Sequence, residues 1–161
     1  MSKLAIDGGK PLHTKPWRTG AFHVREELRV LSDVLSGPAL PMARGPRVMK
    51  LREDLQACYG MRYAVPVSSG SAAIHVALFA AGVGAGDEVI VSPLTDYGSI
   101  IGIFQLNAIP VFADVLPDSI LMDVADVKKK ITRRTKAIMP VHNGGYAVDM
   151  RALNRLAKAH D

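Results

Sequence analysis

Short apolar runs recur along the chain from Tyr63 onward at a nearly constant spacing. The runs cover residues 63–67, 88–91, 110–113 and 136–141, and their starts lie 25, 22 and 26 residues apart. None of them alternates strictly between polar and apolar residues, which is typical of strands covered on both faces. Each interval has room for one crossover helix, as parallel pairing requires. The sequence therefore predicts an α/β fold with a mainly parallel sheet and flanking helices.

Helical patterns fill the intervals between these runs. The predicted helices cover residues 71–81, 97–106, 124–131 and 149–160. Asp149 is the predicted N-cap of the last helix, because a short acidic side chain can accept hydrogen bonds from the first free backbone N–H groups. The helix over 71–81 is apolar nearly all round, so we expect it to be buried. An alternating pattern calls for a further strand after the last helix, so the chain is expected to be the front portion of a longer one.

The first 60 residues lack this alternation. Residues 24–35 and 47–59 are amphipathic and predict two helices, joined by a glycine- and proline-rich connector over 36–46. Residues 1–19 predict an extended arm. We therefore expect two parts: an N-terminal arm with two lead helices over 1–60, and an incomplete α/β cofactor-binding domain over 61–161.

Charge and composition narrow the classes of partner. The 161 residues carry a net charge of +5, and a basic cluster over 128–136 contains no aromatic residue that could stack on a base. We therefore expect no nucleic-acid partner, and a solvated helix face at this cluster. No run of about 18 apolar residues suggests a membrane span. The single cysteine, Cys58, and the polar N-terminus predict a cytoplasmic protein.

One segment carries a recognisable chemical signal. In Val65-Pro66-Val67-Ser68-Ser69-Gly70-Ser71-Ala72-Ala73, a β-rich run enters a small hydroxyl-rich turn, and a helix begins at once. The N-terminus of a helix leaves backbone N–H groups unpaired and carries partial positive charge, so this arrangement can bind a phosphate group. The alternative interpretation is a serine-capped helix without a ligand.

The sequence does not predict a P-loop, a dinucleotide-binding fingerprint or a metal site. No Lys-Ser or Lys-Thr pair follows a glycine loop, so the turn is not a P-loop. The glycines over 82–86 follow a helix and precede a strand, which reverses the order of a dinucleotide fingerprint. The histidines form no metal-ligand spacing with Cys58, so no metal is expected. His142 either lines a cleft or is a satisfied polar residue at a strand end, and His75 is interpreted as a hydrogen-bonded core histidine.

Several segments together resemble the DegT/StrS family of pyridoxal-phosphate (PLP) sugar aminotransferases. The most informative are VSSGSAAIH over 67–75 and GVGAGDEVIV over 82–91. The likeness continues in AIPVFADV over 108–115, ITRRTKAI over 131–138, and PVH over 140–142 with Gly145. Upstream, LSG over 35–37 and GPRV over 45–48 also match. The resemblance covers nearly the whole chain, in order and at the expected spacings.

This resemblance implies the N-terminal part of a fold-type I large domain and a homodimer with active sites at the subunit interface. It implies transfer of an amino group from a small-molecule donor, usually glutamate or glutamine, to a keto group of a nucleotide sugar. In the family, a Ser-Gly-Ser/Thr-Ala turn holds the PLP phosphate, a role that falls on Gly70, Ser71 and Ala72. The residue after the threonine of the next loop usually stacks on the cofactor ring. Here that residue is Asp96, so either Tyr97 replaces it or stacking is absent. The alternative interpretation of Asp96 is the N-cap of the next helix.

The resemblance also indicates what is missing. The family's Schiff-base lysine and its Glu-Asp-x-Ala motif lie beyond the last residue of this chain, and no catalytic residue is assigned. None of the lysines matches the family's lysine segment: Lys3, Lys10, Lys15, Lys50, Lys128, Lys129, Lys130, Lys136 and Lys158. The chain is therefore interpreted as part of an aminotransferase. The alternative is an inactive truncated or split product that only binds phosphate or assembles with a partner chain.

Overall fold

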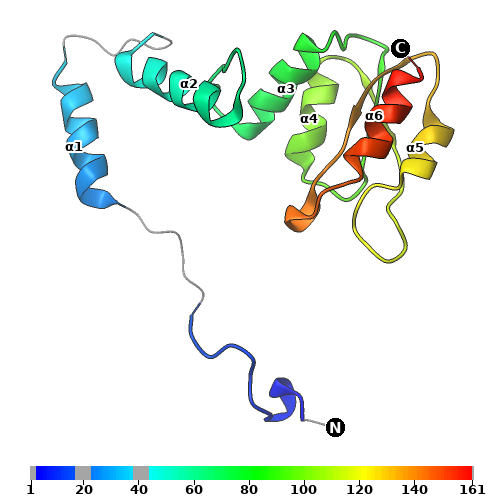
Figure 1. Ribbon diagram of the computed structural model, residues 1–161, viewed down its shortest axis with the longest axis horizontal. Helices are drawn as coiled ribbons and strands as arrows, with labels where there is room; N and C mark the ends of the chain where they lie inside the picture. The colour runs from blue at the N-terminus through cyan, green and yellow to red at the C-terminus, as the bar shows by residue number, and fades with distance from the viewer. Residues whose placement is uncertain (1–2, 17–22, 38–43, 161) are drawn as a thin grey trace. The chain divides into compact units, whose positions relative to one another are not determined.

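A computed structural model describes residues 3–16, 23–37 and 44–160 of the chain (Figure 1). It divides into two compact units, Met1–Asp54 and Leu55–Asp161. No helix within the described ranges is both long and apolar enough to cross a membrane.

The first unit is helical. A short 3-10 helix, η1 (Ala5–Asp7), is followed by α1 (Val24–Leu35) and by α2 (Pro46–Tyr59), which continues into the second unit. Helix α1 has the predicted bounds. Helix α2 begins at Pro46, one residue before the predicted start. Proline is accepted at the first position of a helix because an N–H there would have no partner within the helix. The described part of the arm (3–16) is irregular apart from η1. Residues 1–2 and 17–19 of the predicted arm, and residues 38–43 of the predicted connector, lie outside the described ranges.

The second unit contains a parallel sheet, as the spacing of the apolar runs predicts. Strands β1 (Glu88–Val91), β2 (Ile109–Phe112) and β3 (Thr135–Met139) lie in the order β2-β1-β3. Both pairings are parallel. All four residues of the central strand are buried, which explains why its sequence is a continuous apolar run after Glu88.

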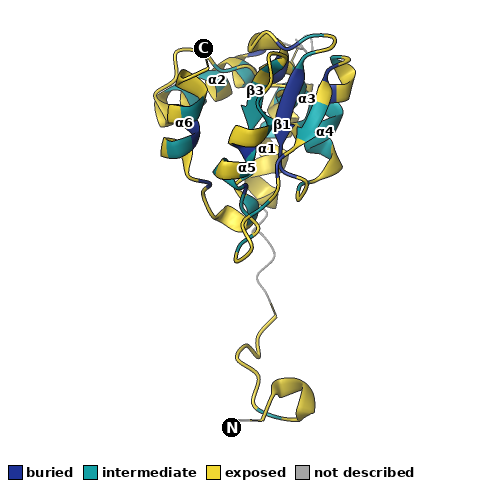
Figure 2. Ribbon diagram, turned by 90° about the vertical axis from the view of Figure 1, so that its right-hand side faces the viewer, coloured by how far each residue is buried: buried dark blue, intermediate teal, exposed yellow. Residues whose placement is uncertain are grey.

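Two pairs of helices cover the two faces of this sheet (Figures 1 and 2). Helices α3 (Gly70–Ala80) and α4 (Tyr97–Gln105) pack on the face where Val89, Val91 and Ile103 form one buried cluster. Helices α5 (Val124–Lys130) and α6 (Met150–Lys158) pack on the other face, around Ile90, Val127 and Leu153. The unit is therefore a three-layer α/β structure, and Asp149 is the N-cap of α6 as predicted.

Helices α3 and α4 approach each other closely at Gly102. A Cβ atom added there would lie 3.0 Å from the backbone nitrogen of His75 and 3.1 Å from its Cα. A side chain would separate the two backbones, so the absence of one keeps α3 and α4 in contact. His75 itself is half-buried, and its imidazole forms no hydrogen bond within the described ranges. The prediction of a hydrogen-bonded core histidine is therefore wrong.

The predicted strand over 63–67 is absent from the sheet. This segment is irregular, and Tyr63 and Val65 are 70% and 69% exposed. Its residues favour extended backbone, but a strand forms only where a neighbouring strand offers backbone groups. Within the described ranges, 63–67 pairs with neither sheet edge, β2 nor β3.

The prediction of a buried α3 is also wrong for the described chain. Only Leu78 of this helix is buried, whereas Val76 is 42% and Phe79 is 70% exposed. The all-round apolar composition predicts cover on every side. The described residues cover only the side of α3 that faces α4 and the sheet.

Candidate functional site

The N-terminus of α3 presents unpaired backbone donors. Ser69 has an extended backbone and is the N-cap, and its Oγ accepts a hydrogen bond from the N–H of Ala72 at 3.1 Å. The carbonyl of Ser69 accepts from the N–H of Ala73 at 3.0 Å. The N–H groups of Gly70 and Ser71 have no partner within the described residues. Serine capping is thus present, and it leaves two amides available to an anion.

The three residues predicted to hold phosphate differ in what they can offer. No atom lies within 4 Å of the position that a Cβ of Gly70 would occupy, so a ligand can approach this backbone closely. The half-buried Ser71 can add its hydroxyl, which makes no hydrogen bond to any described residue. The N–H of Ala72 is already engaged by the Ser69 cap. Gly70 and Ser71 are therefore the available donors.

The N-terminus of α4 lies beside that of α3. Asp96 is the N-cap of α4, and its Oδ1 accepts a hydrogen bond from the N–H of Gly98 at 2.6 Å. A Cβ built on Gly98 would lie 2.7 Å from Ser71 Oγ and 2.8 Å from Asp96 Oδ1, so these two oxygens are neighbours. The structure thus brings Ser71 and Asp96 together from positions 25 apart in the sequence. Tyr97 begins α4 and is 65% exposed.

A cavity of about 670 Å³ opens at the carboxyl ends of β1 and β3, where ligands of open parallel sheets bind. Its lining residues come from the loops that follow these strands: Pro93, Leu94, Thr95, Asp96, Ser99, Val141, His142, Asn143 and Gly144. The amide of Asn143 donates to the carbonyl of Leu94 at 3.4 Å and connects the two loops. The cavity therefore has a mixed polar and apolar lining, which includes the N-cap of α4.

His142 combines both roles that its position suggested. It lines the cavity, and its Nδ1 accepts a hydrogen bond from the N–H of the buried Val148 at 3.2 Å. The neutral imidazole then carries its proton on Nε2. Sequence reasoning missed Ser99 and Asn143 as cavity residues. The signal for Asn143 was its position after a predicted strand, because carboxyl ends of parallel strands share one edge of the sheet.

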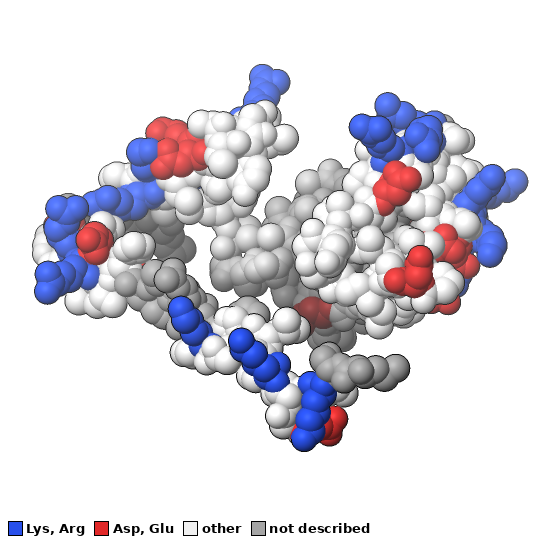
Figure 3. All heavy atoms as spheres, turned by 60° about the horizontal axis from the view of Figure 1, so that its bottom comes forward, with Lys and Arg blue, Asp and Glu red and all other residues white. Residues whose placement is uncertain are grey.

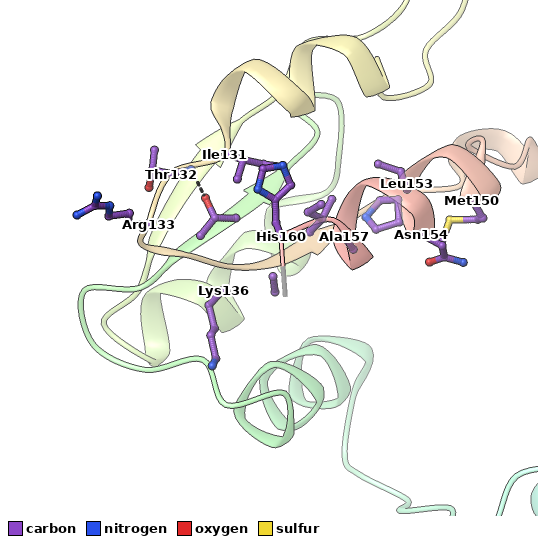
Figure 4. A pocket seen from close by; sticks show the side chains of 13 residues that line it. Ile131, Thr132, Arg133, Lys136, Met150, Leu153, Asn154, Ala157 and His160 are labelled. Atoms are coloured by element: carbon purple, nitrogen blue, oxygen red, sulfur yellow. Dashed lines mark hydrogen bonds between the residues drawn. The ribbon is translucent and has the colours of Figure 1, made fainter.

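A second cavity, of about 610 Å³, lies beside β3 and α6 (Figure 4). Arg133, Lys136 and His160 are its charged or titratable lining residues, and none of the residues predicted to bind cofactor belongs to it. Lys136 extends toward the turn after α3, where its Cε would lie 3.3 Å from a Cβ on Gly82. This cavity is therefore separate from the candidate phosphate site.

The carboxyl groups with shifted pKa values hold structure together. The buried Glu88 accepts hydrogen bonds from Thr132 Oγ1 at 2.5 Å and from Arg134 Nε at 2.9 Å, which lower the pKa of Glu88. The N–H of Asp114 donates to Asp126 at 2.8 Å, and this bond lowers the pKa of Asp126 with help from Lys130. Glu88 begins β1, at the opposite end from the cavity. These shifts have structural causes, so they do not indicate a catalytic acid.

Two basic side chains of the cluster over 128–136 form structural hydrogen bonds or ion pairs. Lys130 Nζ donates to the carbonyl of Phe112 at 2.7 Å, and Arg134 pairs with Glu88. On the face shown in Figure 3, Lys and Arg side chains stand in several separate groups with Asp and Glu between them. Lys128, Lys129 and Arg133 of the cluster are exposed, which agrees with its interpretation as a solvated helix face and its exit turn.

The fold and this site define an α/β protein with unpaired helix N-terminal amides near a cavity at the carboxyl edge of a parallel sheet. Residues 23–161 match the model of the DegT/DnrJ/EryC1/StrS aminotransferase family. The chain belongs to this family.

Known relatives are matched over only part of their length. The chain is 38% identical to L-glutamine:2-deoxy-scyllo-inosose aminotransferase of Streptomyces paromomycinus, over 98% of this chain and 38% of that protein. Spr1654 of Streptococcus pneumoniae, in its PLP form, superposes with a TM-score of 0.79 at 29% identity, over 84% of this chain and 34% of that one. DesV of S. venezuelae superposes with a TM-score of 0.72 at 36% identity, over 85% and 38%. The chain therefore spans less than two fifths of each relative, and its fold is that of part of a fold-type I sugar aminotransferase.

PLP is the cofactor of this family, and the residues present fit its phosphate end. Among the described residues, the open approach at Gly70, the two unpaired amides and the free Ser71 hydroxyl suit a phosphate group. No lysine lines the cavity beside Asp96. The residues present therefore suit the phosphate group of PLP, but they include no lysine in this cavity that could bind PLP covalently.

Proposed function

We propose that this chain supplies the phosphate-binding part of a PLP-dependent aminotransferase that acts on a keto sugar or a related polyhydroxylated ring. The unpaired N–H groups of Gly70 and Ser71, beside a cavity at the carboxyl edge of the sheet, are the observation that carries this proposal. Family membership supports it, because the family's enzymes are aminotransferases.

Each residue of the chain has a specific task in this proposal. The amides of Gly70 and Ser71, the Ser71 hydroxyl and the positive end of the α3 dipole hold the phosphate dianion. Tyr97, at the start of α4, is the candidate for contact with the cofactor ring. Bound PLP supplies the electron sink through which an amino group passes from donor to acceptor. The chain's own contribution is to bind and orient that group.

The amino donor and acceptor are proposals for the longer protein. The resemblance implies a nucleotide sugar with a keto group and glutamate or glutamine as donor. The Streptomyces relative is named for L-glutamine and an inosose, which supports glutamine and a keto group on a polyhydroxylated ring. The relatives are biosynthetic enzymes, which supports a cytoplasmic location.

We also propose that the complete protein is a homodimer. Val76 and Phe79 of α3 and Tyr63 and Val65 upstream are large apolar residues that stand exposed in the described chain. A subunit interface would cover such large apolar side chains, which would otherwise face water. Sedimentation of the complete protein checks this, and a monomer at micromolar concentration contradicts it.

The second candidate function is PLP binding without amino transfer, and one observation on the lysines favours it. Where their contacts are described, lysines occupy structural positions away from the cavity: Lys130 binds Phe112 and Asp126, and Lys136 lines the other cavity. A Schiff base needs a lysine in a shielded pocket. The 161 residues alone would then bind PLP through its phosphate without transferring an amino group.

Borohydride reduction in the presence of PLP tests these proposals. We expect reversible PLP binding to the 161-residue chain and no stoichiometric pyridoxyl adduct on any single lysine by mass spectrometry. A stoichiometric adduct on one lysine would show that the active site has been misplaced. A coding frame that continues with a Glu-Asp-x-Ala motif and a lysine segment would favour the aminotransferase over the inactive product.

A further inference from the structure

Asp96 places a negative charge next to the proposed phosphate site. Its Oδ1 and the Ser71 Oγ lie within 3 Å of one shared point, the position of a Cβ on Gly98, at 2.8 and 2.7 Å. A phosphate oxygen that accepts from Ser71 would therefore lie well within a Debye length of this carboxylate, which is about 10 Å at moderate salt. The two negative groups would repel each other.

The surroundings of Asp96 do not neutralise this charge. Asp96 forms no ion pair within the described ranges. The cavity beside it is lined by hydroxyl, amide and apolar groups and by His142, with no lysine or arginine. The hydrogen bond from the Gly98 N–H stabilises the carboxylate without cancelling its charge.

We propose that Asp96 is a charge-selectivity residue, which weakens phosphate binding at α3 and keeps further anionic groups out of the adjoining cavity. The proposal rests on the proposed function, because it assumes that Gly70 and Ser71 hold the phosphate. The part of a ligand that enters the cavity is then uncharged or cationic, such as a hydroxyl-bearing ring or an amino group. Asp96 determines which ligands bind and is not assigned a chemical step.

The direct test replaces Asp96 by asparagine. Asparagine caps helices as well as aspartate does, so Asp96→Asn removes the charge while α4 keeps its cap. The probe is pyridoxine 5′-phosphate, which lacks an aldehyde and forms no Schiff base with surface lysines. By calorimetry at low salt, we expect Asp96→Asn to bind it about three- to tenfold more tightly than wild type, and the gain to shrink at about 1 M salt. Asp96→Ser, a second neutral cap, should show the same gain.

Two controls isolate the cause. Asp123→Asn removes an equal charge from the N-cap of α5, where Asp123 accepts from the N–H of Ala125 at 2.8 Å, and should leave the affinity unchanged. Pyridoxine, which has no phosphate, should bind wild type and Asp96→Asn alike.

The possible outcomes separate this inference from the proposed function. If Ser71→Ala weakens binding but neither Asp96 variant strengthens it beyond Asp123→Asn, the inference fails and the phosphate site stands. If Ser71→Ala leaves the affinity for pyridoxine 5′-phosphate unchanged, the phosphate is bound elsewhere, and both fail together.

Discussion

At the scale of single residues, the two serines that flank Gly70 at the start of α3 make different contacts. The Ser69 side chain caps α3, because its Oγ accepts a hydrogen bond from the N–H of Ala72. The Ser71 hydroxyl is free within the described residues and stands beside Asp96. The two hydroxyl groups of this turn therefore have different surroundings, and only the structure tells which serine caps the helix.

Substitution of each serine should separate these tasks. Ser69→Ala should lower the free energy of unfolding by about 1 kcal/mol, because it removes the cap. Ser71→Ala should leave the melting temperature nearly unchanged and weaken pyridoxine 5′-phosphate binding by about tenfold, the value of one charge-assisted hydrogen bond at a half-buried site. Thermal unfolding and calorimetry on both variants check this. A larger loss of stability in Ser71→Ala than in Ser69→Ala would contradict the assignment.

Glu88 predicts a specific dependence of stability on pH. Its hydrogen bonds with Thr132 and Arg134 lower its pKa in the folded chain below the ordinary value of 4.5. A carboxyl with a lowered folded pKa stabilises the fold above its unfolded pKa, and this contribution is lost as the pH falls below 4.5 and through the folded pKa. Urea unfolding from pH 7 to about pH 3 should therefore show a shallower acid loss in Glu88→Gln than in wild type. Asp118→Asn, at an exposed loop position, should retain the wild-type slope.

At the scale of elements, the contact between α3 and α4 positions the site. Both helices begin near the cavity edge, and Gly102 allows their backbones to meet at His75. This close approach fixes how near Ser71 and Asp96 can lie. The geometry of the site thus depends on a glycine that touches no ligand.

Gly102→Val should push these two helices apart. Its added atoms would meet backbone atoms of His75 at about 3 Å, which cannot move aside as a side chain can. We expect a loss of about 1–3 kcal/mol in the free energy of unfolding and weaker binding of pyridoxine 5′-phosphate. Gln105→Val places the same β-branched residue on an exposed position of α4 and serves as the control. Equal stability of the two variants would show that the close approach is unimportant.

Elements with local signals could be predicted from the sequence. The caps Asp149 and Asp96, the amphipathic pattern of α1 and the three apolar runs of β1, β2 and β3 act through residues near in sequence. The predicted strand over 63–67 and the predicted burial of α3 depend on partners distant in sequence, which the local pattern cannot supply. Likewise, Ser71 and Asp96 lie near each other because α3 and α4 pack together, so the sequence indicated each residue but not their proximity.

At the scale of the whole molecule, the candidate site belongs to the second compact unit alone. Helices α3 and α4, the sheet and the cavity all lie within Leu55–Asp161. The net charge of +5 adds a weak general attraction for anions. Specific binding must therefore be distinguished from adsorption on basic surface residues.

The central claim is that Gly70 and Ser71 hold the phosphate of a PLP-like ligand. A ¹⁵N–¹H correlation spectrum recorded during titration with pyridoxine 5′-phosphate tests it at the atoms concerned. The account predicts that the backbone amide resonances of Gly70 and Ser71 shift most and saturate together, because these N–H groups gain a charged acceptor. Largest shifts over residues 128–136, with the Gly70 and Ser71 amides unmoved, would contradict it.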